Sequence, residues 1–168
     1  GYAPLPVALP VPVPPTLAVG GDLKNTLAVA EHRYAWLSQH IGDMDDLATL
    51  SAFDSAEQHL EALTGVAPEI VVADSHPGYR STAWAERNAG GRPVRSVQHH
   101  HAHIASVMAE HGLDGSQRVL GFAFDFDESV TKSNWGVEMT WVNRQLFVDN
   151  DEFDGISESG TINMTISA

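Results

Sequence analysis

Four histidines lie within residues 99–103 of this 168-residue chain, in a pattern that could bind a metal ion. His99 and His103 are four residues apart, so a helix that begins near His99 would place both side chains on one face, one turn apart. The positive partial charge of a helix N-terminus disfavours imidazolium, and it would keep both rings in the neutral form that binds metals. The alternatives are that these histidines only hydrogen-bond one another on a solvated face, or that the tract binds nickel adventitiously.

Two histidines are too few for a tight site, and the composition restricts the third ligand. The chain contains no cysteine, so histidine and carboxylate are the strong ligands available. Asp125 ends the strand that we expect after the histidine helix. The sequence therefore predicts a site made of His99, His103 and Asp125.

A second group of residues could bind phosphate. Lys24 follows Gly20 and Gly21, so its ammonium group could supply a point charge to a phosphate while the two glycines let the backbone approach closely. An exposed lysine in a hairpin is the structural alternative. His76 and Tyr79 follow a short apolar stretch, but a histidine before proline in a turn is more often structural than catalytic. They stay outside the predicted site.

The charge of the chain restricts its partners. The formal net charge is −13, and the nine Lys and Arg residues are scattered without a cluster, which argues against nucleic acid and anionic membranes. No apolar run approaches the roughly 20 residues that span a bilayer, and the first residues do not look like a targeting peptide. Together with the lack of cysteine, these features predict a soluble, cytoplasmic protein.

The N-terminal part of the chain shows three different patterns. Proline alternates with small apolar residues through residues 1–15, which favours polyproline conformation and predicts a linker. Short β-rich stretches at 17–19, 25–29 and 34–37 then predict a small antiparallel meander. Residues 46–64 repeat apolar side chains at helical spacing and end before a glycine, so a helix is expected there.

Farther along, strands and helices alternate. We expect strands at 70–73, 94–98 and 119–124 and helices at 81–88 and 101–111, the last with Ile104, Val107 and Met108 facing inward. Such alternation favours an α/β fold with a mainly parallel sheet, whose ligands gather at the carboxyl ends of the strands. Asp74, the histidine tract and Asp125 fall at such ends. Beyond a boundary near residue 125, alternating apolar residues at 135–141 and 162–166 predict two half-buried strands.

The histidine tract also has a family resemblance. Residues 97–105 and 108–113 closely resemble a motif of the carbamoyltransferase family that matures nickel-iron hydrogenases (HypF). Further segments resemble that family in the same order: residues 1–4, 18–26, 38–43 and 74–79. The resemblance covers about residues 1–125 and implies the front part of the family's C-terminal domain, an α/β domain of the actin-like, Hsp70-like ATPase class.

The resemblance implies a reaction and a set of ligands. In such families iron or zinc is held by an H-x-x-x-H motif and by aspartate, which corresponds here to His99, His103 and Asp125. The metal orients a carbamoyl-adenylate made from carbamoyl phosphate and ATP. The carbamoyl group then passes to the C-terminal cysteine of a partner maturation protein and becomes cyanide on the hydrogenase iron.

One stretch departs from the family pattern. Residues 126–128, Phe-Asp-Glu, stand where the family has a Gly-Thr-Gly type of turn that suits phosphate. We therefore divide the chain into a proline-rich linker at 1–15, a partial metal- and nucleotide-binding domain at 16–125 and a β-rich acidic tail at 126–168. A chain that begins with Gly1 and changes after Asp125 is interpreted either as a truncated or fused product, or as a natural divergent protein.

Three functions remain open from the sequence. The first is carbamoyl transfer by an incomplete domain. The second is a non-enzymatic module that binds metal or assembles through its β-rich tail. The third is a soluble α/β domain with surface histidines and no metal.

Overall fold

The computed structural model describes residues 5–125, 134–142 and 160–167, with side chains described as far as Gly121. The chain forms two compact units, residues 1–99 and 100–168. The first unit contains β1 (Val7–Val19), β2 (Leu27–Leu37), α1 (Leu47–Thr64), β3 (Ile70–Asp74), α2 (Arg80–Asn88) and β4 (Val94–Val97). Then follow α3 (His99–Glu110), β5 (Val119–Asp125), β6 (Asn134–Val142) and β7 (Gly160–Ser167). The predicted boundary near residue 125 falls inside the second unit and stays a prediction.

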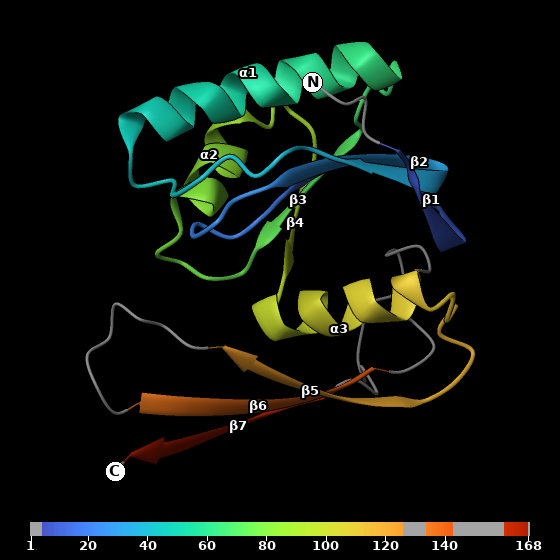
Figure 1. Cartoon of the computed structure of the whole chain (residues 1–168), viewed down its shortest axis with the longest axis vertical. Helices are drawn as coiled ribbons and strands as arrows, with labels where there is room; N and C mark the ends of the chain where they lie inside the picture. Colours follow the sequence, from blue (N-terminus) through green and yellow to red (C-terminus); the bar gives the residue numbers. More distant parts are fainter. Residues whose placement is uncertain (1–4, 126–133, 143–159, 168) are drawn as a thin grey trace. The chain divides into compact units, whose positions relative to one another are not determined.

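The first unit is a mixed sheet covered by two helices. The strand order is β2-β1-β3-β4, with β1 antiparallel to β2 and parallel to β3, and with β3 parallel to β4. Figure 1 shows α1 and α2 on the same side of this sheet. The core between them buries side chains from both helices and from three strands, among them Leu17, Val29, Phe53, Val71 and Trp84. The α/β class and the strand-helix alternation that begins at β3 are confirmed.

The N-terminal strand corrects the prediction of a linker. Residues 7–15 belong to β1, where Val7, Ala8 and Val13 pair with β2. Strand β3 pairs only with Thr16–Ala18. Proline lacks an N–H and fixes φ near −65°, so it fits an extended segment that has a neighbour on one side only. The register shifts twice along these residues, which accommodates the prolines.

The predicted three-stranded meander is also wrong, because residues 34–37 are the end of β2 and not a separate strand. The irregular residue between the two halves of β2 is His32, whose φ is 53° and which pairs with Val13 at a register shift. The sequence around His32 therefore predicts two separate strands, although β2 continues through this residue.

Helix α1 begins and ends where its sequence predicts. The Asp46 side chain accepts a hydrogen bond from the Ala48 amide at 3.2 Å, and Gly65 ends the helix with φ of 73°. Phe53 is fully buried and meets Trp84 edge-on, with the ring centroids 4.7 Å apart. Leu47, although it fits the helical spacing, is 79% exposed.

The second unit combines α3 with an antiparallel sheet of order β5-β6-β7. Both strands predicted in the tail are confirmed, whereas their predicted half-burial concerns side chains outside the described ones. The strand-helix alternation predicted that β5 extends the first sheet; it pairs with β6 instead. Ile104 and Met108 pack with Leu113 and Val119, whereas Val107, also expected to face inward, is 52% exposed.

We expect Phe53→Ala to lower the free energy of unfolding by about 3–5 kcal/mol, because it leaves a cavity beside Trp84. Urea denaturation followed by circular dichroism measures this loss. Leu47→Ala on the same helix is the control and should change stability by no more than about 0.5 kcal/mol. A loss below 1 kcal/mol, on the order of an average substitution, would show that α1 does not pack as described.

A carboxylate pair on α1 makes stability depend on pH. Glu57 lies one helical turn before Glu61, whose Oε1 is 3.8 Å from Nη1 of Arg92. Burial raises the pKa of Glu57, and the charge and hydrogen bond of Glu61 raise it further, against the lowering effect of Arg92, to about 7 from an ordinary 4.5. Part of the Glu57 population is therefore protonated near neutral pH.

We expect Glu57→Gln to flatten the pH dependence of stability between pH 4.5 and 7. Because the pKa is higher in the folded than in the unfolded chain, this group stabilises the fold fully below 4.5 and loses that contribution as the pH rises through about 7. Urea denaturation at several pH values gives the slope. Glu86→Gln, which removes an exposed carboxylate from α2, should leave the slope as in the wild type.

Candidate functional site

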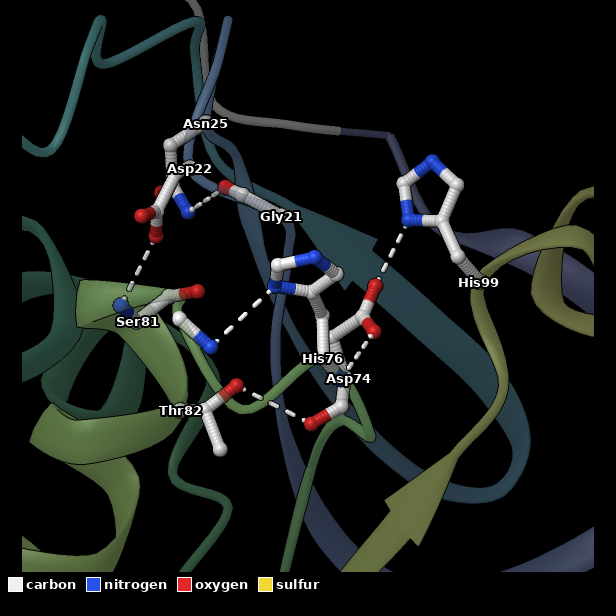
Figure 2. Close-up of polar contacts among 9 residues, drawn as sticks. Gly21, Asp22, Asn25, Asp74, His76, Ser81, Thr82 and His99 are labelled. Atoms are coloured by element: carbon white, nitrogen blue, oxygen red, sulfur yellow. Dashed lines mark hydrogen bonds and ion pairs between the residues drawn. The ribbon is translucent and has the colours of Figure 1, made fainter. Parts of the chain in front are cut away.

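A buried carboxylate and a histidine meet at the carboxyl end of the first sheet. Asp74 is the last residue of β3, and His99 follows β4, the parallel neighbour of β3. His99 Nδ1 lies 2.6 Å from Asp74 Oδ2, and Asp74 is only 8% exposed (Figure 2). Parallel pairing brings these residues together, since it places the ends of adjacent strands at one edge.

Asp74 has two further hydrogen-bond partners, one in the turn that follows it and one in α2. Its Oδ1 accepts from the His76 amide at 2.8 Å, and its carbonyl oxygen accepts from the Thr82 hydroxyl at 2.9 Å. Burial by itself would raise the pKa of the Asp74 carboxyl, but the hydrogen bonds to His99 and His76 and the charge of His99 outweigh it and hold the pKa below the ordinary value. Asp74 is thus a carboxylate at neutral pH.

Aromatic rings and a glycine surround His99. The Tyr79 ring stacks on His76, with centroids 4.3 Å apart, and presents its edge to His99 at 6.2 Å. A Cβ atom added to Gly21 would lie 3.4 Å from both His99 Cε1 and the Tyr79 ring. The loop after β1 therefore passes within van der Waals reach of both rings.

The same loop fixes the start of α2. Asp22 accepts hydrogen bonds from the amides of Arg80 and Ser81 at 2.8 and 2.9 Å, so it caps a helix 58 residues away in sequence. Buried Asn25 holds the loop by donating to the Gly21 carbonyl at 2.6 Å. The sequence placed Asp74 at the carboxyl end of a strand but did not predict its contact with His99. It gave no role to Asp22, which lies three residues after the end of β1.

The structure places two predicted metal ligands in one helix. His99 is the first residue of α3, and His103 lies four residues later on the exposed surface. Burial lowers the pKa of His101 between them, which favours its neutral form. Asp125 ends β5, but its side chain lies outside the described ones. Among the side chains that are described, no three histidines and carboxylates are arranged to hold a metal ion, so the three-ligand set stays a prediction.

The predicted phosphate residue, Lys24, lies exposed in the loop between β1 and β2 with φ of 51°. Gly20 in this loop has a structural reason for lacking a side chain, because a Cβ there would come 2.5 Å from the Thr26 carbonyl oxygen. Its amide donates to that same oxygen at 3.1 Å. The tight closure of the loop, independent of any ligand, requires this glycine.

The fold and the site define the class of this protein. A mixed sheet with helices on one face, and with polar residues gathered at the carboxyl ends of its strands, is an α/β domain of the actin-like ATPase type. The family model described as the HypF Kae1-like domain matches residues 12–110. The chain belongs to this family.

Relatives and solved structures agree with this assignment. The chain is 48% identical over 126 residues to the carbamoyltransferase HypF of Synechocystis sp. and 42% identical over 127 residues to HypF2 of Cupriavidus necator, each match covering 74% of the chain and 16% of the relative. A full-length HypF crystallised in a phosphate- and nucleotide-bound form has a TM-score of 0.73 at 41% identity, covering 84% of this chain and 19% of that one. The HypF of T. kodakarensis has a TM-score of 0.71 at 31% identity, with shares of 85% and 19%.

The matches cover most of this chain but a small part of each relative. The chain spans less than a fifth of the length of these relatives. The matches to the two curated relatives span 126 and 127 residues, 74% of the chain, which agrees with the predicted extent of about 125 residues. As for membranes, no helix within the described ranges is long and apolar enough to cross one.

We expect Asp22→Ala to lower the free energy of unfolding by about 0.5–2 kcal/mol, because it removes the cap of α2. Glu86→Ala, an exposed position on the same helix, is the matched control and should stay within about 0.5 kcal/mol of the wild type. Urea denaturation measures both. Equal stability of the two variants would contradict the capping role of Asp22.

Proposed function

We propose that this chain contributes a metal site to ATP-dependent carbamoyl transfer in the maturation of nickel-iron hydrogenases. In this reaction the carbamoyl group of carbamoyl phosphate passes through carbamoyl-adenylate to the C-terminal cysteine of a partner maturation protein. The proposal rests on one observation above all: the chain belongs to the HypF Kae1-like family, and the residues matched include the histidine tract at the carboxyl edge of the sheet. The two curated relatives that it matches are named carbamoyltransferases.

The donor atoms suit a divalent metal such as iron or zinc. His99 and His103 are one turn apart at the start of α3, where the helix favours neutral imidazole. Asp125 is the third ligand on the sequence argument. A metal bound there would act as a template and Lewis acid, polarising the carbamoyl carbonyl for attack by a thiolate.

Other residues of the same unit have supporting roles in this proposal. Lys24 stands exposed on the loop after β1. In this proposal its ammonium group supplies a point charge to a phosphate of ATP or of the adenylate. The adjoining loop residues Gly21 and Asp22 are fixed against Tyr79 and α2. A rigid loop would limit the motion of a bound phosphate and hold it in one orientation.

A non-enzymatic module is the second candidate. The sheet of β5, β6 and β7 follows the residues that the family model matches, and the sequence after Asp125 has acidic residues in place of the family's phosphate turn. Acidic side chains repel phosphate. In this alternative the chain binds metal or a protein partner and does not bind nucleotide.

We expect the wild-type chain, reconstituted with iron(II) or zinc, to retain about one metal ion, and His99→Ala or His103→Ala to lose it, because each variant removes one ligand. Elemental analysis after desalting measures the metal content. His59→Ala, which removes a histidine from the exposed face of α1, is the control. Metal retained equally by all four proteins would contradict the site.

Calorimetry with ATP separates the two candidate functions. Measurable binding that weakens in Lys24→Ala supports the nucleotide-dependent function. A metal-loaded chain that gives no heat with ATP supports the binding module instead.

A further inference from the structure

The hydrogen bond between Asp74 and His99 assigns a proton to one atom of the histidine ring. An ionised carboxylate has only acceptor sites, so a 2.6 Å contact between Asp74 Oδ2 and His99 Nδ1 requires the proton on Nδ1. With Nδ1 occupied in this way, His99 can bind a metal only through Nε2. The contact therefore decides which nitrogen is the ligand.

The carboxylate is itself held in place. The amide of His76 donates to the other carboxylate oxygen, and the Thr82 hydroxyl donates to the Asp74 carbonyl, both within 3 Å. Figure 2 shows Asp74 between the turn that contains His76 and the ring of His99. A side chain that is buried and bonded at both oxygens cannot rotate without losing a hydrogen bond.

The ring of His99 is restricted on its other sides as well. The Tyr79 ring presents its edge to His99, and a Cβ atom added to Gly21 would lie 3.4 Å from His99 Cε1. These contacts come from the loops after β1 and β3, whereas His99 follows β4. Three loops of one sheet edge thus converge on a single imidazole.

We propose that Asp74 is a positioning residue for the metal site, which holds His99 as the Nδ1–H tautomer and turns Nε2 toward the metal. This inference rests on the proposed function, in which His99 is a ligand. Carboxylates that bond the second nitrogen of a ligating histidine raise its basicity and fix its orientation, and their removal typically costs about 10–100-fold in metal affinity. Asp74 contacts neither the metal nor the substrate in this role.

The first test needs no metal. In long-range ¹H–¹⁵N spectra of the metal-free chain at a pH where the ring is neutral, His99, assigned by loss of its signals in His99→Ala, should be the Nδ1–H tautomer. Asp74→Ala should shift it toward Nε2–H, whereas Asp74→Asn, whose amide oxygen still accepts, should retain more Nδ1–H. A wild-type ring in the Nε2–H form overturns the proposal.

The second test measures zinc affinity by competition with a chelating dye. We expect Asp74→Ala to weaken zinc binding about 10–100-fold and Asp74→Asn to weaken it less. Glu86→Ala is the control: it removes an exposed carboxylate from α2 and should leave zinc affinity unchanged. Thermal melts of the apo variants show whether each remains folded.

The outcomes separate this inference from the function on which it rests. If the wild-type chain does not bind zinc, or binds it equally well after His99→Ala, the proposed function fails and the positioning role fails with it. If zinc binding requires His99 but folded Asp74→Ala binds zinc as tightly as the wild type, the positioning role alone is overturned.

Discussion

The burial of the Asp74 carboxylate is the constraint on which the site depends. A charged group taken out of water is stable only if hydrogen bonds or an opposite charge replace its hydration. Here the replacements come from His99 at the end of β4 and from the turn after β3. Because each partner belongs to a different loop, the carboxylate links two loops at this edge of the sheet. It also determines which ring nitrogen of His99 carries the proton.

The parallel pairing of β1, β3 and β4 makes this arrangement possible. It brings the loops after all three strands to one edge, where Gly21 approaches His99 and Asp22 reaches the amides of α2. The two aspartates have different tasks there. Asp22 accepts hydrogen bonds from the first backbone amides of α2, which have no acceptor within the helix. Asp74 instead accepts a hydrogen bond from His99, the proposed metal ligand.

The same sheet also shows how a strand can contain many prolines. The N-terminal half of β1 pairs with β2 alone, so the missing N–H groups of proline leave no gap in a second ladder. Farther along, residues 16–18 pair on both sides and carry no proline. The composition of β1 therefore changes at the point where the strand passes from the edge into the interior of the sheet.

The sequence by itself determined the local elements and the family. The extents of α1, α2, β3 and β4, the strands β6 and β7, and the histidine pair on one helix follow from periodicity, capping residues and spacing, which are local properties of the chain. The ordered motifs likewise predicted the HypF family, which the match of residues 12–110 confirms.

Only the tertiary structure decided the pairing. The neighbouring strand decides whether residues 7–15 form a linker or a strand, and whether β5 extends the first sheet or joins β6. Hydrophobic periodicity does not indicate which strand that neighbour is. The contact of Asp74 with His99 spans 25 residues and that of Asp22 with Ser81 spans 59. Such contacts form because strands distant in sequence end at the same edge, so the pattern around each residue cannot reveal its partner.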